Sequence, residues 1–338
     1  MKAKDGNIYF ISEKDFFTGE ASTYYKVGLV RNERESSERK KDHQTGNPRE
    51  LKVEEEIATA AVNDLESTLH DRFALSRVSG EWFRFDHQSL ADAREVARKL
   101  AAETLDLREV FAGAEELSGV ISDTTVAPAS SEILDMHREL VLVKSRAKSV
   151  TGLQKHAEKE LKSLTVGFQE IESVCSLRET SLRRTFNRVA FEAEMPALAV
   201  QYTTKKDVRG IFRPSMPSAP RQRKNSDLEE EAVEELLAEA AGTKNRDQRA
   251  ELLHLAFLES LSDLAMVKWR QDVLTHLIQV ACGVADGIDE ICTWKREEKV
   301  SLDTELLKFE EPEIYERFMR ESTPNRTFIV NPFRQYRY

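Results

Sequence analysis

Residues that interrupt helices and residues that cross-link chains are both scarce in this sequence. Its 338 residues include only 13 glycines, 9 prolines and 3 cysteines. This excludes a collagen-like, low-complexity or disulfide-stapled chain, and together with 33% charged residues it favours helix. Cys175, Cys282 and Cys292 have no metal-ligand spacing, so we expect free thiols in a reducing compartment.

Long apolar runs are also missing. No stretch approaches the roughly 20 apolar residues that a membrane-spanning helix needs, and residues 1–5 lack the apolar core of a signal peptide. We therefore expect a cytoplasmic protein that does not enter a membrane. The length has room for two or three domains.

The chain has no overall excess of basic residues, but its charge is unevenly distributed. The formal net charge of −10 by itself argues against a nucleic-acid partner. Residues 131–225 nevertheless carry 18 Lys and Arg against 11 Asp and Glu, whereas residues 226–325 carry 11 against 24. The acidic end of the chain thus hides a basic middle.

Several short motifs within the first 86 residues combine aromatic, basic and carboxylate side chains. They are Asn7-Ile8-Tyr9-Phe10-Ile11, Tyr24-Tyr25-Lys26-Val27-Gly28, Arg39-Lys40-Lys41-Asp42-His43 followed by Gln44-Thr45-Gly46-Asn47-Pro48, the segment from Leu65 to Phe73 that includes Glu66, and Gly80-Glu81-Trp82-Phe83. In this order they resemble the GIY-YIG nuclease superfamily, especially the branch found in many phage and bacterial proteins and in a meiotically up-regulated fungal protein. The resemblance covers residues 5–105.

The resemblance implies a metal-dependent endonuclease in which Glu66 holds a single divalent cation. Mg²⁺ (or Mn²⁺) suits such a site, because Mg²⁺ takes one carboxylate and substrate oxygens while keeping most of its waters. Tyr9 would lie near the metal-bound water as part of the base apparatus. Lys26 stands where the family usually has tyrosine, and it could act as a base or hold a phosphate. Without the resemblance, a lone carboxylate at a helix edge is more often solvated or salt-bridged.

Arg39 and His43 match the family's Arg-x-x-x-His element. Four residues apart on a helix, their side chains face the same way, so the guanidinium could meet the phosphate while the imidazole handles a proton. Taken alone, the two residues would more often belong to a solvated charged helix. His70 is expected to support Glu66 or the fold by hydrogen bonding.

The expected fold is an α+β domain over residues 1–117, a small antiparallel sheet with helices, followed by a mostly α-helical region that contains a coiled coil. Strands are expected at 7–12, 24–30, 51–53 and 80–86, and helices at 33–43, 57–73 and 90–107. In the second helix, apolar residues recur at every fourth position from Ile57 to Phe73. That spacing would place one apolar row against the sheet.

Beyond a linker at 118–131, the sequence changes character. From Ile133 to Cys175, apolar residues follow at alternating steps of three and four, which predicts a coiled-coil helix within segment 132–224 and a homodimer or larger assembly. Segment 225–338 is expected to form a helical domain that ends in a short strand. Its stretch from Leu252 to Ala285 is apolar on more than one side and so should be buried on several faces, against the first long helix, a second copy of the chain, or both. No internal repeat is evident.

The basic middle is the candidate nucleic-acid-binding segment. Arg183, Arg184 and Arg188 are expected on one helical face, and Lys205 and Lys206 begin a connector that could follow a phosphate backbone. The alternative is that these residues pair with the acidic stretch 228–239 of the same chain.

The sequence therefore predicts an endonuclease that hydrolyses phosphodiester bonds of DNA, with RNA left open. The resemblance suggests a role in phage–host conflict, that is, antiviral defence. Two alternatives remain: a nucleic-acid-binding protein without turnover, and a coiled-coil scaffold or regulator.

Overall fold

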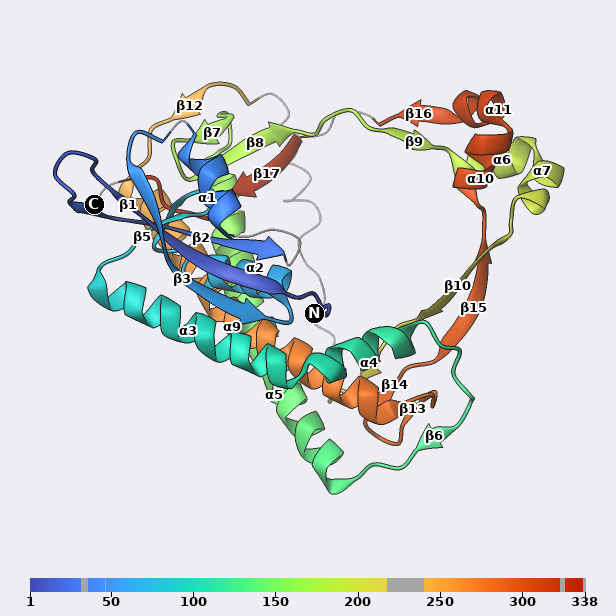
Figure 1. Cartoon of the computed structure of the whole chain (residues 1–338). Helices are drawn as coiled ribbons and strands as arrows, with labels where there is room; N and C mark the ends of the chain where they lie inside the picture. The colour runs from blue at the N-terminus through green and yellow to red at the C-terminus, as the bar shows by residue number, and fades with distance from the viewer. Residues whose placement is uncertain (32–35, 46, 218–239, 323–325, 337–338) are drawn as a thin grey trace.

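The computed structural model describes residues 1–31, 36–45, 47–217, 240–322 and 326–336. Its architecture is α+β, with several antiparallel sheets and two long helices (Figure 1). Among the described residues, no helix combines the length and apolarity that crossing a bilayer requires.

A five-stranded antiparallel sheet forms the N-terminal part, with the strand order β3-β1-β2-β5-β4. The strands are β1 (Gly6–Lys14), β2 (Ala21–Arg31), β3 (Glu50–Thr59), β4 (Arg77–Ser79) and β5 (Trp82–Arg84). The helices are α1 (Ser36–Gln44), α2 (Val62–Arg72), α3 (His87–Asp106) and α4 (Arg108–Ser118). The α+β prediction for this part is confirmed.

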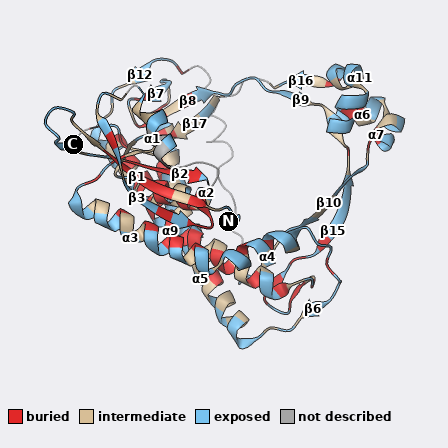
Figure 2. Ribbon diagram, in the orientation of Figure 1, coloured by how far each residue is buried: buried red, intermediate tan, exposed pale blue. Residues whose placement is uncertain are grey.

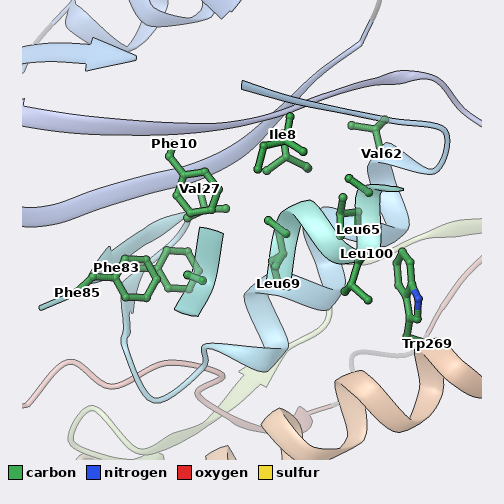
Figure 3. Packing of buried hydrophobic residues seen from close by; sticks show 14 of the residues in the cluster. Ile8, Phe10, Val27, Val62, Leu65, Leu69, Phe83, Phe85, Leu100 and Trp269 are labelled. Carbon is green, nitrogen blue, oxygen red and sulfur yellow. The ribbon is translucent and has the colours of Figure 1, made fainter. Parts of the chain in front are cut away.

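One face of the sheet forms the main core. Ile8, Phe10 and Val27 alternate with residues of the opposite face, and they pack on apolar residues of α2 and α3 (Figure 3). Trp269, from the long helix α9 (Gln248–Cys282), joins this cluster, and its indole nitrogen donates to Glu103 Oε2 at 2.7 Å. The sheet and the C-terminal part therefore share one core.

The boundaries of two elements differ from those predicted. The third strand has ten residues rather than three, because β3 pairs with β1 along its whole length, from Gly6↔Thr59 to Lys14↔Glu50. The predicted 57–73 helix begins only at residue 62. The apolar row with helical spacing begins at Ile57, which lies in β3, and continues into α2. Residues up to Thr59 form a strand because they pair with β1.

Helix α9 is buried on several sides, as its apolar sequence predicts. It packs against α5 (Ser131–Leu164), α2 and α4, and it contributes to three separate apolar clusters. Figure 2 shows buried residues concentrated along it and along the sheet. Where α5 lies against α9, Arg270 also forms two hydrogen bonds to Glu139, at 2.6 and 2.8 Å.

The apolar row predicted from Ile133 onward lies along α5 and meets one of the partners that the sequence left open, the second long helix, but it is shorter than predicted. Within α5 its positions are buried or half-buried, with Leu140 and Leu161 fully buried. The helix ends at Leu164, so the predicted helical seam to Cys175 is wrong in its last part: Ile171 and Cys175 lie in short strands. The seam meets α9 of the same chain, so it supplies no surface for pairing with a second copy.

The C-terminal part is built from two repeats, residues 126–214 and 243–330. The first comprises β6 (Val126–Ala127), α5, β7 (Glu170–Ile171), β8 (Cys175–Glu179), β9 (Arg184–Phe186), α6 (Arg188–Glu194), α7 (Pro196–Gln201), β10 (Lys205–Gly210) and β11 (Arg213–Pro214). The second comprises, in the same order, β12 (Thr243–Lys244), α9, β13 (Gly287–Ile288), β14 (Cys292–Thr293), β15 (Arg296–Ser301), α10 (Thr304–Glu310), α11 (Pro312–Arg317), β16 (Met319–Glu321) and β17 (Arg326–Val330). Even the strained residues agree: Ser173 and Glu290, at equivalent positions, have φ values of 62° and 58°.

The two repeats exchange strands with each other. Six strand pairs link the first repeat to the second: β6–β13, β7–β12, β8–β17, β9–β16, β10–β15 and β11–β14.

Hydrogen bonds between the repeats are reciprocal. The Asn187 amide donates to the Phe318 carbonyl, and the equivalent Asp303 amide donates to the Tyr202 carbonyl, both at 2.8 Å. Such reciprocity is the signature of a two-fold arrangement. The expectation of no internal repeat is therefore wrong.

A histidine on each long helix repeats the same contact. His137 Nε2 donates to the Ser215 carbonyl and His254 Nε2 donates to the Asn331 carbonyl, both at 2.8 Å. The two repeats thus form, within one chain, the arrangement that a strand-exchanged homodimer forms with two. The C-terminal region is also less helical than predicted, because short strands alternate with its helices.

Two antiparallel ribbons, β9–β16 and β10–β15, connect the body to four short helices that lie apart from the sheet (Figure 1). These helices, α6, α7, α10 and α11, enclose their own small core, which includes Phe191, Tyr202, Leu307 and Phe318. The ribbons themselves are mainly exposed (Figure 2).

Candidate active site

The second face of the N-terminal sheet carries the side chains that the motifs singled out. The antiparallel register places Tyr9 opposite Gly28 and Ile11 opposite Lys26, so Tyr9 and Lys26 share this face. A Cβ atom at residue 28 would lie only 2.5 Å from the Tyr9 hydroxyl oxygen. Glycine is required here because the Tyr9 ring lies directly over the backbone of β2.

Helix α1 and the turn after it cover this face. Tyr9 is fully buried, and its hydroxyl lies 3.3 Å from His43 Nε2. The Gln44 side chain braces the turn, because its amide donates to the Arg49 carbonyl at 2.8 Å and its Oε1 accepts from the Leu51 amide at 2.9 Å. The Gln-Thr-Gly-Asn-Pro motif therefore holds α1, and His43 with it, against the sheet.

Helix α2 completes the exposed edge of β2. The Val27 amide donates to the Glu81 carbonyl at 3.0 Å. Beyond this point β5 is too short to continue the ladder, and two α2 side chains take its place. His70 Nε2 donates to the Val27 carbonyl at 2.8 Å, and the Leu29 amide lies close enough to the Glu66 carboxylate to stabilise its charged form. Since i and i+4 side chains share one face of a helix, Glu66 and His70 both face backbone groups of β2 that a longer β5 would have paired.

The supporting role predicted for His70 is confirmed by this contact. Burial lowers the pKa of His70, which favours a neutral ring with its proton on Nε2.

Glu66 sits in an environment that opposes its ionisation. It is half-buried rather than sealed. Burial, followed by the negative charge of Glu81, raises the pKa of Glu66 to about 7. The Leu29 amide, Lys26 and Arg77 act in the opposite direction but do not outweigh these effects. A carboxylate held at this balance changes charge near neutral pH.

Glu81 is a site residue that the motif contained but to which the sequence assigned no role. Lys26 Nζ lies 2.7 Å from Glu81 Oε2, and Lys26 is largely buried. Burial alone would raise the pKa of Glu81, but the hydrogen bond from Lys26 and its positive charge outweigh burial, so the pKa of Glu81 lies below its ordinary value. The ion pair holds the Lys26 side chain in place beside Glu81, an arrangement that suits a residue that positions a phosphate.

A shallow pocket of about 400 Å³ opens beside these residues. Lys26, His43 and Trp82 line it, together with Asn47 of the turn. Tyr9 does not reach the pocket, but it touches His43.

Glu66 is absent from the pocket lining, but it lies within electrostatic range of Lys26 and Glu81. The structure thus brings Tyr9, Lys26, His43 and Glu66 to one edge of the sheet. The backbone of Arg39 lies in α1, one turn before His43, while its side chain is outside the described residues.

The donors present fit a hard divalent cation. Mg²⁺ commonly binds one or two carboxylates and leaves its other positions to water and substrate. Glu66 and Glu81 are two such oxygen donors, and a cation beside them would offset the unfavourable burial and repulsion that raise the pKa of Glu66. Within the described residues, no cluster of three or more His, Cys, Asp or Glu side chains is placed to hold a metal by itself.

The five basic residues proposed for nucleic-acid binding lie in or beside two different ribbons. We predicted that Arg183, Arg184 and Arg188 share one helical face. This prediction is wrong, because Arg184 begins β9 and Arg188 begins α6. Lys205 and Lys206 begin β10 on the other ribbon.

Several of these charges are already paired. Arg184 Nη2 lies 2.8 Å from Glu316 Oε2, and Lys206 Nζ lies 3.1 Å from Glu298 Oε1. The alternative to DNA binding, pairing within the chain, is therefore realised in part. Glu316 and Glu298 belong to the second repeat, and Arg188 pairs with Glu192 of its own helix, whereas the stretch 228–239 lies outside the described residues.

In comparisons with known proteins, no family model matched the chain, and neither curated proteins nor solved structures gave a match.

Proposed function

We propose that the N-terminal domain is a metal-dependent endonuclease that hydrolyses phosphodiester bonds of DNA. The observation that carries the proposal is the meeting of Glu66, Glu81, Lys26 and the Tyr9–His43 pair at one edge of the sheet. Phosphodiester hydrolysis requires a cation near the phosphate, a fixed positive charge and a group that moves a proton. These residues supply each of the three.

Each residue has a definite part in this proposal. Glu66 holds Mg²⁺ or Mn²⁺, which when bound polarises the phosphate and makes a water more acidic. Lys26, oriented by Glu81, contacts a phosphate oxygen. His43, hydrogen-bonded to the Tyr9 hydroxyl, transfers the proton at the pocket side of the pair. Arg39 adds a second positive charge from α1.

The test is nicking of supercoiled plasmid in the presence of Mg²⁺. Glu66→Gln keeps an oxygen that can accept from the Leu29 amide but removes the charge, so we expect a loss of about 100-fold or more. Glu55→Gln is the matched control, because Glu55 is a partly buried glutamate of β3 that pairs with Arg94 and Arg98. It should leave nicking unchanged.

Other outcomes identify the alternatives. Salt-sensitive DNA binding by the wild-type protein without any nicking would favour a binding protein without turnover. Absence of both activities would favour a scaffold.

The homodimer stays a prediction. Light scattering over a range of protein concentrations, which gives the molar mass, tests it. A dimer would have to use a surface other than the α5 seam.

A further inference from the structure

A second hollow lies beside the candidate active site and is larger. It has a volume of about 1200 Å³ and lies between the strand ends of the N-terminal sheet and the C-terminal tail, residues 334–336. Tyr24 and Arg84 line the sheet side, and Arg334 and Tyr336 line the tail side. Residues that are remote in sequence therefore build one groove.

The groove continues the face that carries the candidate site. Tyr24 lies opposite Arg84 in the β2–β5 register, and Lys26 lies opposite Trp82 two residues further along. Side chains two apart on a strand share a face and lie about 7 Å apart along it.

The tail that forms the far wall is held firmly. The Arg334 amide donates to the Arg77 carbonyl at 2.9 Å, which ties the tail to β4. The Tyr336 hydroxyl lies 3.0 Å from Nδ1 of His254, which is fully buried in α9. The Arg334 guanidinium lies 4.9 Å from the centre of the Tyr336 ring. This wall is thus held by contacts with both the N-terminal sheet and α9.

The side chains in the groove have a common chemical character. The Tyr24 side chain is 40% exposed, and Arg84 is exposed. Within the described part of the chain, no acidic side chain forms an ion pair with Arg84. The one carboxylate in the lining, Asp86, accepts from the Ser89 amide at 2.7 Å and caps α3. The groove therefore offers an aromatic face and positive charge.

We propose that this groove binds an unpaired strand of nucleic acid that extends from the phosphate at the candidate active site. Tyr24 stacks on a base and Arg84 contacts the backbone. An exposed aromatic ring beside a guanidinium is the combination by which proteins hold single strands, whereas the base faces of a duplex are covered by their neighbours. The inference rests on the proposed function only in placing the scissile phosphate near Lys26.

The test uses the full chain carrying Glu66→Gln, so that no cleavage interferes. Fluorescence anisotropy with labelled 12-nucleotide DNA and RNA strands, and with a duplex of the same sequence, gives the affinities. Tyr24→Ala should weaken single-strand binding by about 5- to 100-fold, and Arg84→Ala should weaken it and reduce its salt dependence. Arg138→Ala, at an exposed arginine of α5, is the charge-matched control and should change nothing.

The results separate the groove from the nuclease. If Tyr24→Ala and Arg84→Ala bind as tightly as their parent, with native circular dichroism, or if the duplex binds as tightly as the single strand, the groove proposal is overturned. A preference for either the DNA or the RNA strand supports it and identifies the sugar. If binding depends on Tyr24 and Arg84 but the wild-type protein does not nick DNA, the groove proposal is supported and the proposed nuclease function is refuted. If the wild-type protein nicks DNA and neither substitution changes the nicking rate, the nuclease function is supported and the groove proposal is refuted.

Discussion

Replacing Glu66 by glutamine should make the protein more stable at alkaline pH and leave its stability unchanged in acid. The carboxylate has an ordinary pKa of 4.5, and burial together with Glu81 raises it to about 7. Between these values the folded protein keeps a proton that the unfolded chain has released. The free energy of unfolding therefore falls as the pH rises through this window. Glutamine carries no charge, so it avoids this loss.

The size of the effect follows from the shift in pKa. From 4.5 to about 7, at about 1.4 kcal/mol per unit, it amounts to about 3 kcal/mol. Solvent screening of a half-exposed group reduces this to about 2 kcal/mol. We expect Glu66→Gln to match the wild type at pH 4 and to exceed it by about 2 kcal/mol at pH 8.

Urea unfolding followed by tryptophan fluorescence at pH 4 to 8.5 measures the difference. Glu55→Gln serves as the control and should lose a little stability, because it gives up its contacts with Arg94 and Arg98. Mg²⁺ at pH 8 should stabilise the wild type but not Glu66→Gln, which narrows the gap. A difference between Glu66→Gln and the wild type that does not change with pH, or a wild type more stable than the variant at pH 8 without metal, would refute the reasoning.

Further predictions concern the site, the core and the repeats. Gly28→Ala should destabilise the protein by about 2–3 kcal/mol in urea unfolding, because the new methyl group collides with Tyr9. Leu258→Ala removes a fully buried side chain of α9 and should cost about 2–5 kcal/mol. Cys282→Thr should change stability by less than about 1 kcal/mol, since Thr165 holds the equivalent position in the first repeat. At a subsaturating Mg²⁺ concentration, the nicking rate should rise with pH through about 7, as the metal-binding carboxylate of the site ionises. A rate that is flat or falling over that range would contradict this assignment.

Local signals in the sequence predicted the N-terminal domain well. Runs rich in Ile, Tyr, Val and Phe predicted β1 and β2, and the turn residues around Asn47 marked the return to β3. The spacing of Glu66 and His70 placed both on one side of α2, because that depends only on helix geometry. The apolar character of α9 all round predicted its burial on several faces.

Contacts between residues far apart in the sequence decided features that the local spacing of residues could not predict. The sequence contained Glu81 in a motif, but only the fold placed it against Lys26 and near Glu66. The arginines at 183–188 looked helical from their spacing, yet strand exchange with the second repeat made part of them a ribbon.

The sequence by itself determined the periodic elements and the residue types of the candidate site, because both are expressed over a few neighbouring positions. Only the tertiary structure decided that the α5 seam meets α9 of the same chain and that two repeats exchange strands. Strands of two to six residues carry too little information to specify partners more than 70 residues away in the chain. Their pairing is selected by the burial of α5 and α9 against each other, which brings both sets of strands together at once.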